Sequence, residues 1–493
     1  MQWTAEQNAI FEDGLAGSGH TIITARAGAA KTSSMVELAQ RLPAKSRGLA
    51  LAFNASIRDE LKARLPANFR AMTLNGCGFE AWRRFIRKPT KVDKDKTYNL
   101  FTEVAAELEK AESDEVWEKF GELRKAVSMA KNAGYLPVKS AGYRPLVDGE
   151  DFYNFHLDIN ATELEREVID EILKRSWRMT LEGILDFDDM LLAPAVAGVG
   201  FDHYDFVLVD ESQDLSAINH VLLKKVVRGT TRLIAVGDPC QAIYGFRGAD
   251  SSSMETLRRL FSAKELFLTT SFRCSRAVCE NARWRAPDMN SPEWAAEGEV
   301  RTLPGWSSED IPDGAAIICR NNAPLFAIAI RLIRAGRYPE LKGRDIIKGL
   351  ITKMRKLGPG TLTREEALKS LAGWEAAEKL RQKDKHLVSD QADCMRLFIN
   401  ETETLKQACA FAEGLSQQTG RLHLMTGHGS KGLEYDHVFF LDQHLIDIKR
   451  GQDNNVKYVI ETRAKLTLTY ITSEGFADDQ KETDGDAAVG VEA

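Results

Sequence analysis

The stretch Phe206-Val-Leu-Val-Asp210-Glu211-Ser-Gln-Asp214 constrains the fold of this chain more than any other. Its four apolar residues form a short continuous run, which is typical of a strand buried on both faces of a parallel sheet. Such sheets place their ligand crevice at the carboxyl ends of the strands, where Asp210 and Glu211 stand. There Asp210 can hold Mg²⁺ and Glu211 can act as a base toward water in nucleotide hydrolysis. The alternative is a strand that ends at a solvated acidic turn.

A second expected strand, 20–24, leads into a loop of small residues and then a helix through Leu42. This order is typical of a phosphate cradle, in which backbone N–H groups face phosphates, a lysine neutralises charge and a hydroxyl reaches Mg²⁺. The glycine positions of the pattern GxxxxGK[ST] fall on Ala25 and Ala30, and Ala30 fits if its φ is negative. The alternative is a plain strand-to-helix turn. The candidate nucleotide-binding residues here are Ala27, Gly28, Ala29, Ala30, Lys31, Thr32 and Ser33, with Thr32 and Asp210 as the metal ligands.

Polar and aromatic residues follow further expected strands at 47–53, 69–74 and 232–237. Hydroxyls and amides in such places can contact the phosphates of a single nucleic-acid strand, and aromatic rings can stack on its bases. For any one residue, a loop or core role is the alternative. The basic and aromatic stretch 82–88 is equally an amphipathic helix with a solvated face. The candidate residues for contact with a nucleic-acid strand are Phe53, Asn54, Thr73, Asn75, Trp82, Tyr244, Phe246 and Arg247.

The net charge of −6 means that a nucleic acid must be held by a local basic groove, because the average field repels it. No apolar run reaches the roughly 18 residues of a membrane span, and the first residues carry no basic-then-apolar signal. The seven cysteines are scattered without a CxxC pair, which argues against zinc, an iron–sulfur cluster or a disulfide framework. We therefore expect no membrane partner and a reducing compartment, namely the cytoplasm of a bacterium or of a virus's host, or a eukaryotic nucleus.

Six motifs stand along the chain in a fixed order. After the phosphate loop, 209–214 reads VDESQD, and 237–250 follows GDxxQxIYx[WF]RGAD throughout. An aromatic–Arg pair stands at 272–273, 428–436 follows HxSKGLE[FWY]D, and 458–465 is similar to YVAxTRAK. Together these motifs resemble those of superfamily 1 helicases of the UvrD/Rep/PcrA type over about residues 1–472, since each adds its own context to the others.

The resemblance implies an α/β fold with two RecA-like parallel-sheet domains of the P-loop NTPase class, helical insertions, and ATP with Mg²⁺ between the sheets. It implies that Arg273 and Arg463 act as arginine fingers from the second sheet; a structural salt bridge is the alternative for each. Phe272 would stack on adenine, Gln7 would read its edge and Glu434 would bind the ribose. Gln7 also stands three residues after Thr4, at a capping-box spacing. The implied catalytic residues are Lys31, Asp210, Glu211, Gln241, Arg273 and Arg463.

In function, the resemblance implies an ATP-dependent DNA helicase that moves 3′→5′ on single-stranded DNA and unwinds the duplex ahead. Its expected partners are single-stranded DNA, junctions of single and double strands, and unidentified replication or repair proteins. One alternative is a translocase that displaces proteins from DNA without strong unwinding. Another is a degenerate nucleotide-dependent DNA-binding module, which Ala30 motivates. ATP hydrolysis with and without single-stranded DNA separates the motors from the binding module.

The shift from apolar runs to charged helical stretches predicts the domain organisation. We expect residues 1–78 and 185–265 to form the first RecA-like domain, which binds ATP, and 266–343 and 417–473 to form the second. A helical insertion, 79–184, interrupts the first, and a reduced helical insertion, 344–416, interrupts the second. Residues 474–493 form an acidic tail that we expect to be disordered.

Overall fold

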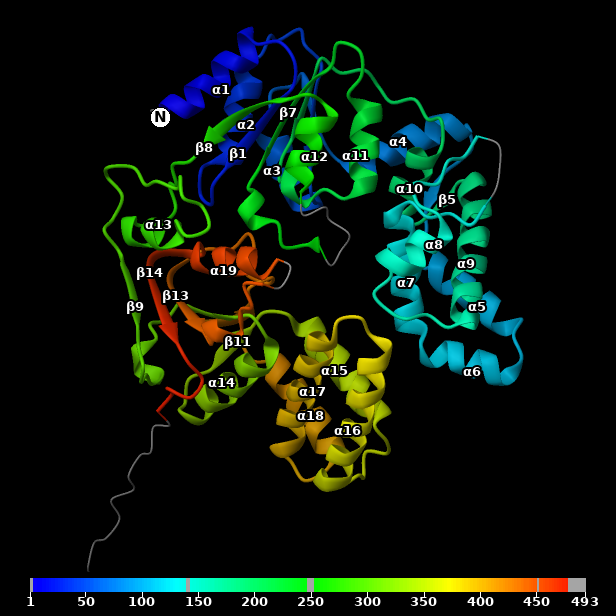
Figure 1. The fold of residues 1–493 in the computed structure, drawn as a ribbon, viewed down its shortest axis with the longest axis vertical. Helices are drawn as coiled ribbons and strands as arrows, with labels where there is room; N and C mark the ends of the chain where they lie inside the picture. Colours follow the sequence, from blue (N-terminus) through cyan, green and yellow to red (C-terminus); the bar gives the residue numbers. More distant parts are fainter. Residues whose placement is uncertain (1–2, 139–141, 246–251, 450–451, 478–493) are drawn as a thin grey trace, which may run out of the picture.

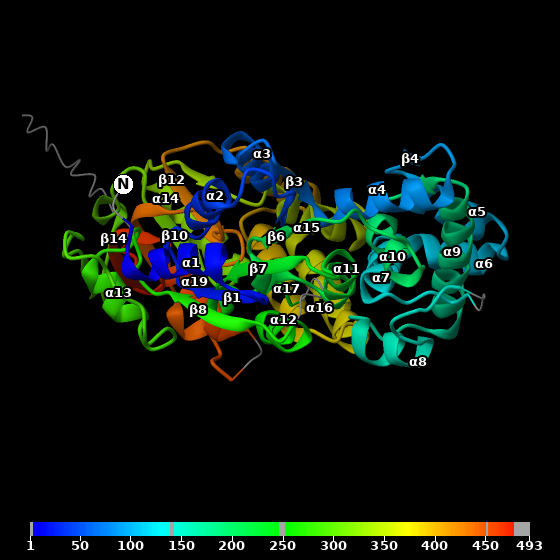
Figure 2. The same cartoon turned by 90° about the horizontal axis from the view of Figure 1, so that it is seen from above.

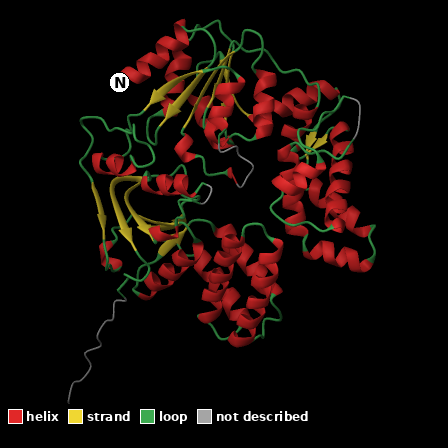
Figure 3. Cartoon of the chain, viewed as in Figure 1, coloured by secondary structure: helices red, strands yellow, loops and turns green. Residues whose placement is uncertain are grey.

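Two six-stranded parallel sheets, each with a helical insertion, make up the chain (Figures 1 and 3). The structure is a computed structural model that describes residues 3–138, 142–245, 252–449 and 452–477. The predicted α/β fold with two RecA-like sheets is confirmed. Within the described ranges no helix is both long and apolar enough to cross a membrane.

The first sheet has helices on both faces. Successive residues of its strands point to opposite sides, so Ile23 packs with helices α1–α3, while Ile22 packs with α10–α12. All residues of β1, β2 and β7 are buried, as expected for parallel strands covered on both sides. The strands in spatial order are β3 (Phe69–Thr73), β2 (Gly48–Ala52), β6 (Phe206–Val209), β7 (Arg232–Gly237), β1 (Thr21–Ala25) and β8 (Lys264–Leu268). The helices are α1 (Ala5–Ala16), α2 (Lys31–Arg41), α3 (Ala55–Arg64), α10 (Asp189–Val196), α11 (Ala217–Val226) and α12 (Ser253–Leu260).

The second sheet repeats the arrangement. Its edge strands β11 and β9 have no apolar run of their own, and the sequence patterns did not predict them. The strands in spatial order are β11 (Pro339–Leu341), β12 (Leu422–Thr426), β10 (Ala316–Cys319), β13 (Tyr435–Leu441), β14 (Ala464–Ile471) and β9 (Glu299–Thr302). Its helices include α13 (Arg276–Ala282), α14 (Asn322–Arg334) and α19 (Asp453–Glu461).

The structure adds detail at two of the expected boundaries. Strand β8 pairs with β1 from Lys264 to Leu268, so the division expected between 265 and 266 falls inside a strand of the first sheet. The expected tail starts at 474, but Phe476 is buried against Trp306, with ring centroids 4.6 Å apart. Residues 478–493 lie outside the described part of the chain.

The first insertion follows α4 (Leu74–Ile86) and is held by a buried ionic cluster. The Nζ of Lys96 lies 2.6 Å from Asp189, and the Nζ of Lys131 lies 2.8 Å from it. The second insertion contacts the first where Asn160 N donates to Arg381 O at 3.0 Å. The first insertion contains β4 (Lys91–Val92), α5 (Lys96–Ala106), α6 (Lys110–Glu118), α7 (Phe120–Ala133), α8 (Gly149–Asp151), the π-helix Phe152–His156, α9 (Glu163–Leu181) and β5 (Ile184–Leu185); the second contains α15 (Arg344–Lys356), α16 (Arg364–Arg381), α17 (Lys385–Asn400) and α18 (Leu405–Ser416).

Strand order brings three motif segments to one edge of the first sheet. Strand β7 lies between β1 and β6, with Thr24 beside Gly237 and Val209 beside Ala235. Because all three strands are parallel, the segments that follow them leave the sheet on the same side. The phosphate loop, Asp238 and Asp210 therefore become neighbours.

Candidate functional site

The phosphate loop joins β1 to α2 and touches the second half of the chain. Ala27 is buried, and its N–H donates to the Tyr458 hydroxyl at 3.2 Å. Gly28 has a φ of +74°, and a Cβ there would lie 2.5 Å from the Cβ of Arg273. Gly28 is therefore required both by its backbone conformation and by the close approach of the 271–273 segment.

Ala30 adopts a left-handed conformation immediately before α2, with φ +54° and ψ 39°. The condition under which alanine fits this position without strain, a negative φ, is therefore not met. The loop must turn sharply to present its N–H groups at the start of the helix, and the left-handed region provides that turn. For a residue with a Cβ this conformation costs about 1–2 kcal/mol.

Ala30→Gly is therefore expected to raise the free energy of unfolding by about 0.5–1 kcal/mol, because relief of strain exceeds the entropy that glycine loses on folding. The neighbouring Ala29, which lacks a positive φ, is a matched control, and Ala29→Gly should lower stability by about 0.4–1 kcal/mol. Chemical denaturation of both variants checks this. Equal destabilisation by the two substitutions would contradict the strain at Ala30.

The carboxylates after β6 face the start of α2. The Thr32 hydroxyl donates to Asp210 Oδ2 at 2.7 Å, and Lys31 Nζ lies 3.2 Å from the Glu211 carboxylate. Burial, followed by the charge of Glu211, raises the pKa of Asp210 to about 6. Burial also raises the pKa of Glu211, but the charges of Lys31 and Lys431 outweigh it and lower that pKa to about 2. The two adjacent carboxyls thus have opposite shifts, an arrangement that suits different chemical roles.

A chain of polar contacts leads from these carboxylates to the second sheet. Gln213 accepts from Asp238 N at 3.0 Å, and Gln241 Nε2 donates to Asp238 Oδ2 at 2.7 Å. The other end of the Gln241 amide accepts from Arg463 Nη2 at 3.3 Å. Arg463 is 1% exposed; burial and then the charge of Arg273 lower its pKa to about 10.

Arg273 and Phe272 approach the phosphate loop from the other half of the cleft. Phe272 N donates to Gly28 O at 2.9 Å, and Arg273 Nε donates to Glu434 Oε2 at 2.7 Å. The Phe272 ring is partly exposed and lies nearly parallel to Trp294, with centroids 6.4 Å apart. Both residues thus lie beside the phosphate loop, and Arg273 here contacts a carboxylate.

Two other predicted nucleotide-binding residues have structural contacts. Gln7 is buried, receives the N–H of Thr4 at 3.0 Å in a capping box, and donates to Ser34 Oγ at 3.0 Å. Ser33 accepts from Arg64 Nη2 at 3.0 Å. The amide of Gln7 retains one hydrogen and one lone pair beyond these contacts.

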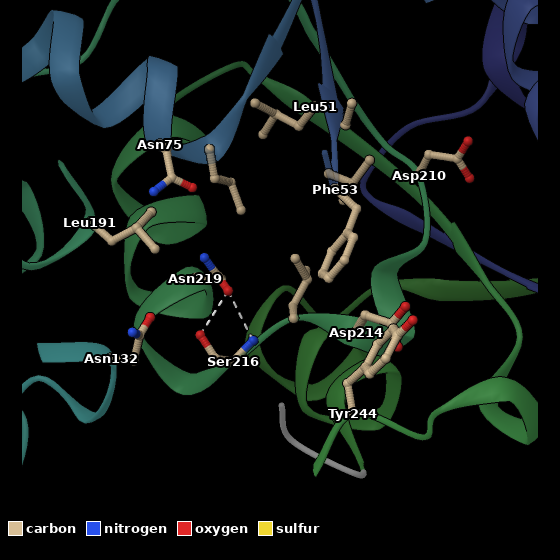
Figure 4. A pocket seen from close by; sticks show the side chains of 14 residues that line it. Leu51, Phe53, Asn75, Asn132, Leu191, Asp210, Asp214, Ser216, Asn219 and Tyr244 are labelled. Carbon is tan, nitrogen blue, oxygen red and sulfur yellow. Dashed lines mark hydrogen bonds between the residues drawn. The ribbon is translucent and has the colours of Figure 1, made fainter. Parts of the chain in front are cut away.

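A pocket of about 210 Å³ opens beside the carboxylates at the ends of β2 and β6 (Figure 4). Phe53, which is 40% exposed, stacks on Tyr244 with centroids 6.1 Å apart and planes 3° from parallel. Lys431 Nζ lies 4.6 Å from the Tyr244 ring centroid. The amide groups of Asn75, Asn132 and Asn219 also line the pocket.

The other residues that we predicted to contact a nucleic-acid strand have different surroundings in the structure. Asn54 and Thr73 cap α3 and α4, and Asn75 Nδ2 donates to Phe187 O at 2.8 Å. Trp82 is 0% exposed, and its indole N–H donates to Thr180 O at 3.2 Å, so its prediction as a nucleic-acid contact is wrong. Helix α4 is amphipathic and turns its apolar face, including Trp82, toward Trp177. The predicted contacts Phe246 and Arg247 lie outside the described residues.

The family model for the UvrD/REP helicase N-terminal domain matches residues 3–262, more than half of the 493 residues. The chain belongs to the UvrD/REP helicase family. Among its relatives, F-box DNA helicase protein 1 of Schizosaccharomyces pombe is 25% identical over 94% of the chain and 57% of its own length. F-box DNA helicase 1 of Gallus gallus is 25% identical over 95% of the chain and 49% of its own length. The chain thus spans about half the length of these two relatives.

A shorter match joins the chain to bacterial members. The ATP-dependent DNA helicase PcrA of Staphylococcus aureus is 29% identical over 107 residues, which are 20% of the chain and 15% of that protein.

Sequence reasoning missed several residues of this UvrD/REP cleft. Lys431 donates to Asp214 at 2.6 Å and to Gln241 O at 2.8 Å, and it thereby joins the two sheets. Its position in the motif 428–436 was the available signal. Asn132 of the first insertion carried no such signal, because it joins the pocket through the folding of a distant segment.

Proposed function

We propose that the chain is an ATP-driven DNA helicase that moves 3′→5′ on single-stranded DNA and unwinds duplex DNA. The observation that carries this proposal is one cleft lined from both sheets, in which Gln241 of the first sheet lies 3.3 Å from Arg463 of the second. A nucleotide bound there would contact both halves. Its hydrolysis would then change how the halves are held together.

In the proposed mechanism, ATP competes with Glu211 for Lys31, whose Nζ now lies 3.2 Å from that carboxylate. Thr32 and Asp210 supply adjacent oxygens, 2.7 Å apart, that suit Mg²⁺, which prefers oxygen ligands and leaves other positions to phosphates and water. When bound, this ion would neutralise charge on the phosphates. Glu211, released from Lys31, would accept the proton of the attacking water.

The two arginines would complete the site from the second sheet. Arg273 would leave Glu434 for the phosphates, and Arg463 would add a second positive charge where negative charge develops in the transition state. Phe272 would stack on adenine, with Gln7 at the edge of the base and Glu434 at the ribose. Gln241, which contacts both Asp238 and Arg463, would sense the γ-phosphate.

Coupling to the DNA strand would pass through Lys431. This side chain contacts Gln241 O, the Asp214 carboxylate and the ring of Tyr244, which stacks on Phe53. A shift at the nucleotide would therefore reach the aromatic pair that we propose as a base-stacking platform. Stacking tolerates any base, so the proposed binding has weak sequence preference.

The test is ATP hydrolysis with and without single-stranded DNA, followed by strand displacement. We expect turnover to rise with single-stranded DNA, to fall as salt increases, and to drive separation of a duplex that has a 3′ single-stranded end. Lys31→Ala is the matched inactive control. Stimulated hydrolysis with displacement of bound protein but not of a strand would support the translocase instead. If single-stranded DNA does not stimulate ATP hydrolysis, only the alternative of a nucleotide-dependent DNA-binding module remains.

A further inference from the structure

The phosphate loop carries a cation besides Lys31, namely Arg26. Its side chain is 12% exposed and forms a fork with Asp288, in which Nε lies 2.7 Å from Oδ1 and Nη2 lies 2.9 Å from Oδ2. Such a two-bond contact fixes the direction of the guanidinium as well as its distance from the carboxylate. The fork therefore holds the first part of the phosphate loop in a defined place relative to Asp288.

Asp288 belongs to the second half of the chain. It follows α13, which packs against β14 and β9 of the second sheet and lies beside α19 (Figures 1 and 2). The next residue, Met289, is 0% exposed, and its sulfur lies 3.7 Å from the hydroxyl of Tyr458 in α19. The fork between Arg26 and Asp288 thus crosses the cleft.

Two further contacts join the phosphate loop to the second half directly after Arg26. Ala27 N donates to the Tyr458 hydroxyl at 3.2 Å, and Gly28 O accepts from Phe272 N at 2.9 Å. Three successive residues of the loop are therefore fastened to the second half. The contacts of Ala27 and Gly28 use the backbone of the loop, whereas the fork is formed by side chains. A substitution can remove the fork and leave the other two contacts in place.

Arg26 also faces a carboxylate of the first half. Its Nη1 lies 3.7 Å from Oδ1 of Asp238, whose side chain is 0% exposed. Asp238 in turn accepts from Gln241 Nε2 at 2.7 Å. One guanidinium therefore connects the second half, the phosphate loop and the carboxylate that holds Gln241, the proposed sensor of the γ-phosphate.

We propose that Arg26 is a positioning residue that makes the phosphate loop and Gln241 follow movements of the second half, through its fork with Asp288. This inference rests on the proposed ATP-driven function and adds to it a link that is separate from Lys431. A fork transmits rotation as well as translation, because turning the carboxylate lengthens at least one of the two bonds. Loss of the fork should therefore weaken the dependence of ATP binding on DNA binding.

The test measures this dependence as the ratio of two dissociation constants for a non-hydrolysable ATP analogue with Mg²⁺, one without and one with single-stranded DNA. The variant is Asp288→Asn, which keeps the shape of the side chain, removes its charge and leaves Arg26 beside Asp238. Glu280→Gln is the matched control, because it removes the same charge from an exposed position of α13. Asp288→Glu, which keeps a carboxylate, is the rescue variant.

We expect Asp288→Asn to bring the ratio closer to one by about 3–10-fold, and Asp288→Glu and Glu280→Gln to leave it within about twofold of the unmodified chain. Stimulation of ATP hydrolysis by single-stranded DNA should fall in the same variant. An unchanged ratio in Asp288→Asn, or an equal change in Glu280→Gln, would overturn the inference. Weaker binding of the analogue without DNA at an unchanged ratio would show that the fork is only structural.

A second comparison tests the other partner of the fork. Arg26→Lys keeps a positive charge near Asp238 but loses the two-bond geometry, so it should lower the coupling as well. The double variant Arg26→Lys/Asp288→Asn should be no worse than Asp288→Asn, because both substitutions break one link; additive losses would overturn that link. The ratio of dissociation constants requires no turnover. Failure of DNA to stimulate hydrolysis by the unmodified chain would therefore count against the proposed helicase activity and leave this comparison intact.

Discussion

Glu211→Gln is expected to lower the rate of ATP hydrolysis by about 10²–10⁴-fold and to leave ATP binding as tight as before or tighter. The substitution keeps the shape of the side chain and removes only its ability to accept a proton as a carboxylate. Glu211 stands in a left-handed backbone conformation, with φ +50°, which turns the residue out of the direction of β6. Such strain is commonly retained where a side chain has to be aimed at a reacting group.

Binding should survive because Lys31 keeps other partners. Burial alone lowers the pKa of Lys31, but Glu211, Asp238 and Asp210 outweigh it and raise that pKa. Without the charge of Glu211, two carboxylates still face the ammonium group. The loss of this negative charge also removes repulsion toward the phosphates and removes the competitor for Lys31. ATP affinity is therefore expected to stay equal or increase.

Single-turnover hydrolysis and equilibrium binding of ATP measure the two effects separately. Glu211→Asp is the control, because it keeps the carboxylate and shortens its reach; it should retain more activity than Glu211→Gln. Undiminished turnover of Glu211→Gln would show that Glu211 is not the base. Weakened binding with unchanged turnover would assign Glu211 to the positioning of Lys31 instead.

The parts of the fold that the sequence predicted well are those with a local signal. The buried runs of β1, β2, β6 and β7 are apolar because helices cover both faces of the sheet, so each strand can be recognised by itself. Strand β9, Glu-Val-Arg-Thr, lies at the edge of its sheet, where it pairs with β14, and it carries polar exposed residues. Because β9 has no apolar run, its sequence resembles that of a loop.

The errors at the site arise where distant residues decide the outcome. Trp82 and Phe85 stand in one basic and aromatic stretch, but the packing of Trp177, far along the chain, buries the first and leaves the second 44% exposed. Ala30 shows a different limit. Its residue type favours a negative φ, and the sharp turn of the phosphate loop into α2 outweighs that local preference. Motifs therefore predicted which residues meet, but not their backbone conformations or burial.

Arg273→Ala is expected to lower the maximal rate of ATP hydrolysis by about 10³–10⁵-fold, the range typical of an arginine finger. Its guanidinium lies at the junction of both halves: a Cβ at Gly28 would lie 2.5 Å from the Cβ of Arg273, and Nε donates to Glu434 at 2.7 Å. The side chain is 19% exposed, so it can leave Glu434 for a phosphate without exposing a buried cavity. Arg463 is 1% exposed and donates hydrogen bonds to two backbone carbonyls. Truncating it would also destabilise the protein, so an Arg463 variant tests the chemistry less cleanly than Arg273→Ala.

Glu434→Gln is the matched control for Arg273→Ala, because it breaks the same ion pair from the other side. If Arg273 has only a structural role, the two substitutions should have similar effects, since each removes the pair. If Arg273 stabilises the transition state and Glu434 binds the ribose, Arg273→Ala should lower kcat, whereas Glu434→Gln should mainly raise KM for ATP. Steady-state kinetics at saturating single-stranded DNA separate these outcomes. An equal change in kcat for both variants would contradict the assignment of Arg273 as a catalytic residue.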